Sequence, residues 1–125
     1  MTGIHVYGIS QCSTVKKARD WLDRHHLAYQ FHDYKRTPPN AGQLKIWAHA
    51  LGWQALLNRR GTTWRQLDKT TQDSIDNSDA AIALMLEKPS IIRRPVLEYG
   101  SLLLAGFDAA EWQQRLTVQP SDSLA

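Results

Sequence analysis

The first 34 residues follow a strand, helix and strand pattern, and this order constrains the fold more than any other feature of the chain. Gly3 to Tyr7 alternates side chains with the period of two that is typical of a strand. Apolar residues then recur at helical spacing from Ser13 to about His25, and Leu27 to Tyr34 alternates again. A unit of this kind predicts two parallel strands joined by a right-handed crossover.

The middle of the chain is helical in pattern. Thr37-Pro38-Pro39-Asn40 separates it from the first unit, because proline and asparagine favour turns. Asn77 or Ser78 is a suitable N-cap for the last of its helices. The predicted helical segments are Gln43–Leu51, short pieces near Thr63–Leu67 and Thr71–Ile75, and Asp79–Leu86.

The last third of the chain predicts two strands and a helix. Two apolar runs flank Tyr99-Gly100-Ser101, which predicts an antiparallel hairpin, and Asp108 is placed to cap a final helix that ends near Leu116. The order is then β-α-β, a helical block, and β-β-α. This order predicts an α/β protein with a thioredoxin-like fold and an all-helical insertion at about residues 40–87. We expect one domain over residues 1–117 and a flexible tail over residues 118–125.

Composition narrows the classes of function. A chain of 125 residues with a net charge of +3 suits one domain with a small anionic ligand, and it lacks the strongly basic character of a direct nucleic-acid binder. No apolar run approaches the length of a membrane span, and the N-terminus has no secretory signal pattern. A single cysteine excludes an internal disulfide. We therefore expect a cytoplasmic protein without a membrane partner.

That cysteine, Cys12, lies where the first strand pattern ends and the first helix pattern begins. The free N–H groups and the dipole at a helix start favour an anion, so a thiolate there has a lowered pKa and becomes a nucleophile. Lys16 and Lys17 add positive charge in the first turns. The alternative is a buried structural thiol, because free cysteine packs as a small apolar residue. The polar neighbours of Cys12 favour the reactive interpretation.

Arginines form the second candidate group. In a thioredoxin-like fold a cis-proline precedes the third strand and lies across from the active cysteine, and the Arg94-Pro95 bond holds this place in the order of elements. Arginine offers a planar fork that matches a carboxylate or an oxyanion. We expect Arg94 to face Cys12; Arg59 and Arg60 are further candidates, although arginine pairs are also common on solvated surfaces. The five histidines have no metal-ligand spacing with Cys12, so we expect no metal site.

Three ordered blocks of the sequence resemble the arsenate reductase (ArsC)/Spx family, and the YffB-like branch most of all. The resemblance extends over about residues 3–117. The blocks are Tyr7-Gly8-Ile9-x-x-Cys12-x-Thr14-x-Lys16-Lys17-Ala18, then Asn58-Arg59-Arg60-Gly61-Thr62 after Tyr34, and Lys88-Pro89-Ser90-Ile91-Ile92-Arg93-Arg94-Pro95-Val96-Leu97.

The resemblance implies a thioredoxin-like fold with a helical insertion in a bacterial cytoplasmic protein. It also implies that Cys12 is the nucleophile and that Arg60 and Arg94 match the arginines that hold the oxyanion. Two features depart from the arsenate enzymes: residues 101–107 lack their third arginine, and Gly8 replaces a histidine upstream of the nucleophile. Val15 stands where Spx regulators have the second cysteine of their disulfide switch.

The function expected from these features is that of a glutathione-dependent thiol reductase, in which Cys12 attacks a disulfide or an oxyanion. Glutathione would be the reductant and co-substrate, with glutaredoxin as a further candidate partner and a small-molecule or protein disulfide as substrate. The residues expected to bind substrate or glutathione, besides Arg60 and Arg94, are Thr14, Lys16, Arg93 and Pro95. Two rivals stay open: a Spx-like regulator that binds the transcription machinery, and an arsenate reductase that uses glutathione and glutaredoxin.

Overall fold

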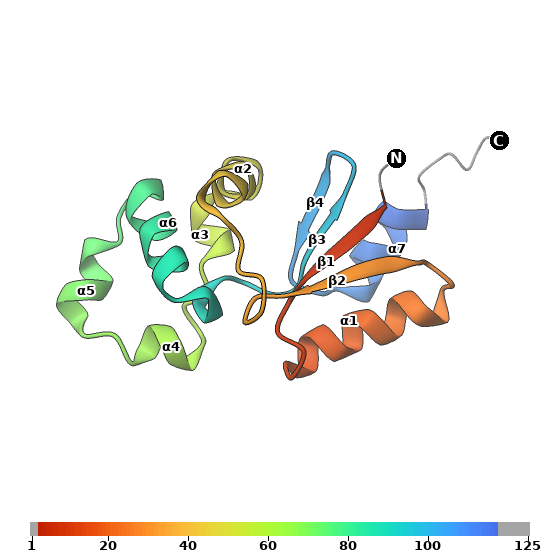
Figure 1. Cartoon of the computed structure of the whole chain (residues 1–125), viewed down its shortest axis with the longest axis horizontal. Helices are drawn as coiled ribbons and strands as arrows, with labels where there is room; N and C mark the ends of the chain where they lie inside the picture. The colour runs from red at the N-terminus through yellow and green to blue at the C-terminus, as the bar shows by residue number, and fades with distance from the viewer. Residues whose placement is uncertain (1–2, 118–125) are drawn as a thin grey trace.

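The computed structural model describes residues 3–117, which form a four-stranded sheet with helices on both faces and a helical lobe beside it (Figure 1). The predicted tail at residues 118–125 lies outside the described residues. The strands are β1 (Ile4–Gly8), β2 (Tyr29–Asp33), β3 (Val96–Tyr99) and β4 (Leu102–Ala105). The helices are α1 (Ser13–Arg24), α2 (Ala41–Leu51), α3 (Trp53–Leu56), α4 (Thr62–Arg65), α5 (Lys69–Ser74), α6 (Ser78–Glu87), the 3-10 turn η1 (Pro89–Ile91) and α7 (Ala109–Thr117).

The sheet has the strand order β2-β1-β3-β4. β1 and β2 are parallel, as expected for strands joined through α1, whereas β1–β3 and β3–β4 are antiparallel. Val6 lies opposite Phe31 on one side and Leu97 on the other. This topology confirms the α/β class and the thioredoxin-like fold, with the helices α2–α6 inserted between its two halves.

Two apolar cores lie on opposite faces of the sheet. On one face, α1 and α7 cover alternate strand residues such as Val6 and Leu97 with fully buried side chains that include Leu22 and Trp112. On the other face the insertion supplies Trp47, which packs edge-on against the Tyr7 ring with the centroids 4.9 Å apart. Burial of side chains this large is the main driving force for the packing. The insertion is therefore part of the folded unit.

Short polar side chains set where the inserted helices begin. The side chains of Asn40, Asp68 and Asn77 each accept a hydrogen bond from a backbone N–H three residues later, which caps α2, α5 and α6. Asn77, and not Ser78, is thus the cap of α6. The helix α3 had no counterpart among the predicted segments.

The end of α3 is joined to the segment before β3. Leu57 forms an isolated antiparallel bridge with Ile92, the N–H of Asn58 donates to the carbonyl of Ile91 at 2.8 Å, and the N–H of Arg93 donates to the carbonyl of Leu56 at 2.7 Å. These bonds bring a loop of the insertion beside the residues that lead into β3. Within residues 3–117, none of the helices has the length and apolar character needed to cross a membrane.

Candidate active site

Cys12 is held by the backbone at the junction of β1 and α1. Its N–H donates to the carbonyl of Ile9 at 3.0 Å, and its own carbonyl accepts the N–H of Lys16 at 3.0 Å, so that Cys12 is the N-cap residue of α1. Its side chain makes no capping hydrogen bond and is only partly buried. The thiol therefore remains accessible at the start of the helix.

Gly8 allows the close approach of β1 and α1 that places Cys12. A Cβ atom on Gly8 would lie 2.7 Å from Cγ2 of the buried Val15 and 3.6 Å from Cβ of Arg94. A larger residue there would have to displace a stiff, β-branched side chain in a packed core. The position that carries a histidine in the arsenate enzymes thus has no room for one in this chain.

The surroundings of Cys12 favour its thiolate. Partial burial raises the pKa of the Cys12 thiol. The backbone N–H groups of Val15 and Thr14 and the guanidinium of Arg94 lower it by more than burial raises it, so the pKa of Cys12 lies below its ordinary value. The structure thus supports a reactive cysteine over an inert structural one.

Arg94 is positioned by the segment that leads into β3. The Arg94–Pro95 peptide bond is cis, as expected. Nη1 of Arg94 donates to the carbonyl of Ser90 at 2.7 Å, while its Nε is buried and has no hydrogen-bond partner among residues 3–117. A buried donor without a partner is costly, and Arg94 interacts with the sulfur of Cys12, which favours the thiolate over the neutral thiol.

Arg93 is fixed by its backbone, and its side chain lies against the loop after β4. Its N–H donates to Leu56, as described above, and its carbonyl accepts the hydroxyl of the buried Tyr34 at 3.1 Å. Its guanidinium lies on Gly106, where an added Cβ would be only 2.9 Å from Nη2 of Arg93. Gly106 has a φ of +79° and donates its N–H to the carbonyl of Pro95 at 2.8 Å. The loop after β4 thus supports the side chain of Arg93.

The insertion contributes two more arginines from the loop after α3. The side chain of Asn58 accepts the N–H of Arg60 at 3.1 Å, which fixes the turn. The guanidinium of Arg59 lies 5.7 Å from the ring centres of both Trp53 and Trp64, a distance at which a cation is attracted to an aromatic face.

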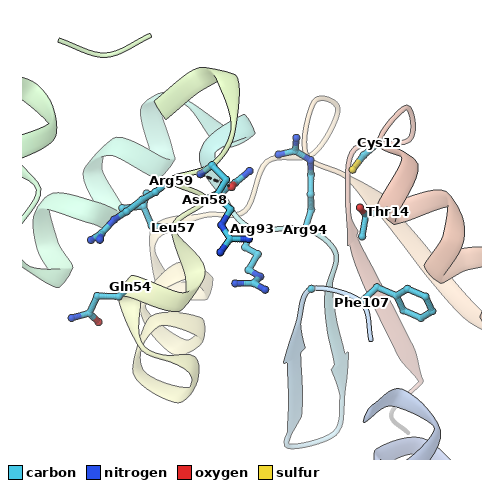
Figure 2. A pocket seen from close by; sticks show the side chains of 11 residues that line it. Cys12, Thr14, Gln54, Leu57, Asn58, Arg59, Arg93, Arg94 and Phe107 are labelled. Carbon is cyan, nitrogen blue, oxygen red and sulfur yellow. Dashed lines mark hydrogen bonds between the residues drawn. The ribbon is translucent and has the colours of Figure 1, made fainter. Parts of the chain in front are cut away.

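These groups line one cavity of about 600 Å³, within the range of about 300–1,000 Å³ typical of small-molecule sites. Figure 2 shows Cys12 and Thr14 on one side, the residues of the insertion on the other, and Arg93 and Arg94 between them. The lining residues are Cys12, Thr14, Gln54, Leu57, Asn58, Arg59, Arg60, Arg93, Arg94, Gly106 and Phe107. We call this cavity the arginine pocket.

The structure brings most of the expected site residues together. Cys12, Thr14, Arg60, Arg93 and Arg94 line the arginine pocket. Two do not: Lys16 is exposed on α1 outside the lining, and Pro95 is buried beneath it.

Five lining residues were not among the expected site residues: Gln54, Leu57, Asn58, Gly106 and Phe107. Gly106 and Phe107 follow β4 directly, and the glycine at a strand end was the available signal for a close approach. Gln54 and Asn58 carried no signal of their own, because only the pairing of Leu57 with Ile92 brings this loop to the site.

A second polar cluster lies on the face of the sheet that the insertion partly covers. Glu98 accepts hydrogen bonds from the Tyr7 hydroxyl at 2.9 Å and from Nε1 of Trp47 at 2.6 Å, and the rings of His5 and His32 are joined at 2.9 Å. Burial and Glu98 raise the pKa of Tyr7 to about 12. Residues 3–117 contain no group of three or more His, Cys, Asp or Glu side chains that could hold a metal ion.

Known proteins share this architecture. A solved YffB protein is 46% identical, with a TM-score of 0.86 over 90% of this chain and 98% of its own. A solved arsenate reductase (ArsC) related protein from Brucella melitensis is 41% identical, with a TM-score of 0.72 over 89% of this chain and 92% of its own. The global transcriptional regulator Spx of Streptococcus mutans is 29% identical over 102 residues, which is 80% of this chain and 73% of that protein.

The model of the ArsC family matches residues 7–115, from the end of β1 to the last helix. This range includes Cys12 and every other residue that lines the arginine pocket. The chain belongs to the ArsC family.

Proposed function

We propose that the protein is a glutathione-dependent thiol reductase in which Cys12 is the nucleophile. The observation that carries the proposal is the placement of the chain's one cysteine at the start of α1, with a lowered pKa, at the edge of a pocket that contains four arginines. A thiolate of this kind attacks disulfides, and the guanidinium groups attract the carboxylates of the glutathione part of a mixed disulfide.

The reaction proceeds through two exchanges. The Cys12 thiolate attacks the glutathione sulfur of a mixed disulfide; a Cys12–glutathione disulfide forms, and the other thiolate leaves and takes up a proton. The thiolate of a second glutathione then attacks the glutathione sulfur of this adduct, which yields oxidised glutathione and restores the Cys12 thiolate. The second step needs an external thiol because the chain has no other cysteine.

The residues of the pocket divide these tasks. Arg94 and the N–H groups of Thr14 and Val15 stabilise the sulfur anion. Arg60 and Arg93, which also line the pocket, would hold carboxylates farther from the sulfur. The roles expected for Lys16 and Pro95 in binding stay predictions, since neither lines the pocket.

Mass spectrometry of the intact protein tests the proposal. After incubation with oxidised glutathione at neutral pH, we expect one glutathione adduct per chain in the native protein and none in Cys12→Ser. Added glutathione should then remove the adduct, and a panel of small disulfides and glutathionylated proteins should show turnover. Failure of Cys12 to form the adduct would contradict the proposal.

A regulatory role is the second candidate, because the chain is similar to Spx over 80% of its length. A regulator that acts only by binding does not need the thiol of this chain, since Val15 leaves no second cysteine for a disulfide switch. A cellular function that persists in Cys12→Ser would favour this candidate, whereas its loss in Cys12→Ser favours the reductase.

A further inference from the structure

The arginine pocket offers hydrogen-bond donors in excess. Of its lining residues, all of which lie within the described part of the chain, four are arginines and none carries a carboxylate. The neutral polar side chains of the lining are those of Thr14, Gln54 and Asn58. A ligand cation would therefore be repelled by the four arginines and would find no carboxylate in the lining.

Several acceptors around the pocket are already in use. The carbonyls of Leu56, Ser90 and Pro95 accept hydrogen bonds from the Arg93 N–H, the Arg94 Nη1 and the Gly106 N–H. The side-chain oxygen of Asn58 accepts the N–H of Arg60, as noted above. The framework that supports the arginines thus engages four of the oxygens near the pocket, and the oxygens left to a ligand ammonium are neutral ones, such as those of the Thr14 and Gln54 side chains.

Asp108 is the nearest carboxylate in sequence, directly after Phe107, and it is otherwise engaged. Its Oδ1 accepts the N–H of Glu111 at 3.1 Å and so caps α7. Its side chain is exposed and is not part of the pocket lining. Asp108 is therefore the one residue with which recognition of an ammonium can be tested directly.

The arginines are also divided in space. Arg94 lies at the sulfur of Cys12, whereas Arg93 lies on the loop after β4, and Arg59 and Arg60 extend from the insertion. Cations beside the sulfur and farther along the cavity (Figure 2) suit a ligand with two separate anionic groups at different distances from its sulfur.

We propose, on the basis of the function proposed above, that the pocket selects its thiol co-substrate by two carboxylates alone and does not recognise the α-ammonium of glutathione. The substrate class is then wider than glutathione. It comprises thiols, and their disulfides, that carry two carboxylates, with or without an amino group.

Three disulfides separate these contributions: oxidised glutathione, the disulfide of N-acetylglutathione, and the disulfide of the glutathione diester. The first retains all charges, the second loses the ammonium charge, and the third loses both carboxylates. The rate of mixed disulfide formation at Cys12 is measured for each at constant ionic strength. Each rate is divided by the rate with a small reference thiol, which corrects for the intrinsic reactivity of the disulfide.

The proposal expects the N-acetyl compound to react within about twofold of oxidised glutathione or faster, and the diester to react roughly tenfold or more slowly. Arg93→Ala should slow the reaction of Cys12 with the first two compounds and leave the rate with the diester nearly unchanged. The reason is that it removes a guanidinium that binds carboxylates, which the diester lacks. Asp108→Asn should change none of the rates. Arg24→Ala, an exposed arginine at the far end of α1, is the matched control for loss of one positive charge.

A rate for the N-acetyl compound that falls tenfold or more would overturn the inference, as would an effect of Asp108→Asn on oxidised glutathione alone. Equal rates for all three compounds would also overturn it while leaving the thiol reductase intact. The proposed function itself fails in a different way, with no adduct at Cys12 from any of the three.

Discussion

The guanidinium of Arg93 lies on the backbone of Gly106, so that an added Cβ there would be 2.9 Å from Nη2 and 3.0 Å from Nε. Arg93 precedes β3 and Gly106 follows β4, and the two meet at the open end of this hairpin, where Gly106 donates its N–H to the carbonyl of Pro95. This contact makes the side chain of Arg93 part of the pocket and Gly106 a positioning residue for it.

Gly106→Ala should displace the guanidinium and slow the reaction of Cys12 with oxidised glutathione by up to about tenfold, because a charge-assisted contact is lost. It should also destabilise the protein by about 1–2 kcal/mol, since alanine is strained at positive φ. Thermal unfolding and the rate of adduct formation measure the two effects.

Gly100→Ala is the matched control for this substitution. Gly100 has a φ of +60° in the β3–β4 turn, and nothing lies within 4 Å of an added Cβ. We expect a similar loss of stability without a change in reaction rate. Equal slowing by both substitutions would mean that backbone strain, and not the position of Arg93, is responsible.

The order of the elements and the position of Cys12 at a helix start could be predicted from the sequence, because both depend on local patterns. Helical spacing, alternation and short polar caps such as Asn77 and Asp108 act within a few residues, and the structure confirms both as caps. The place of Cys12 at a helix start follows from the same local signals.

The shape of the pocket could not be predicted because it depends on contacts between distant segments. The bridge between Leu57 and Ile92 brings Asn58 and its neighbours to the site, and no periodicity in either segment reports it. The contact of the Arg93 guanidinium with Gly106 likewise depends on the register of β3 and β4. Lys16 was expected to bind because it is near Cys12 in sequence, but its side chain leaves the helix on the solvent side.

The alkylation of Cys12 should titrate below the value of a free thiol, about 8.5. Burial alone would raise the pKa, but the N–H groups of α1 and Arg94 lower it more. Since the thiolate is the reactive form, the rate with iodoacetamide should rise with pH and level off at a lower pH than for a small free thiol. Arg94→Ala should move this midpoint upward, because the thiolate loses a cationic neighbour. A midpoint at or above that of the free thiol would contradict the assignment.

Arg94→Ala should also slow glutathione adduct formation roughly tenfold or more, beyond its effect on the thiolate fraction. The comparison is made at a pH above the titration of both proteins, where Cys12 is fully ionised in each. Arg24→Ala is the control. Arg19→Ala is less suitable, because Arg19 donates to the Tyr29 hydroxyl at 3.0 Å and lies 4.1 Å from the ring centre of Phe31. Equal rates for Arg94→Ala and Arg24→Ala would exclude a direct role for Arg94.

Arsenate reduction should be weak or absent, even with glutathione and glutaredoxin supplied. The resemblance to the arsenate enzymes calls for three arginines around the oxyanion, and residues 101–107 supply none of them. Loss of one charge-assisted anchor lowers turnover by on the order of a hundredfold where it acts in the transition state. The guanidinium of Arg93 lies against Gly106, in the segment that lacks the third arginine, and we expect it to compensate partly for this loss. Lys16 is exposed on α1, so we do not expect it to do so.

The arsenate prediction is tested with a coupled reductase assay beside a true arsenate reductase, and Phe107→Arg is the informative variant. Phe107 lines the arginine pocket just beyond β4, and its ring packs edge-on against Trp112 with the centroids 4.9 Å apart. An arginine there adds a further cation near the place of the family's third arginine at some cost in stability, which thermal unfolding measures alongside the assay. The arsenate turnover of this variant should exceed that of the native protein, while its reaction with the disulfide of the glutathione diester, which offers no carboxylate to the new cation, stays unchanged. Native turnover comparable to that of the true enzyme would show that two of the three arginines matching the arsenate enzymes suffice, and arsenate would then become the first candidate substrate.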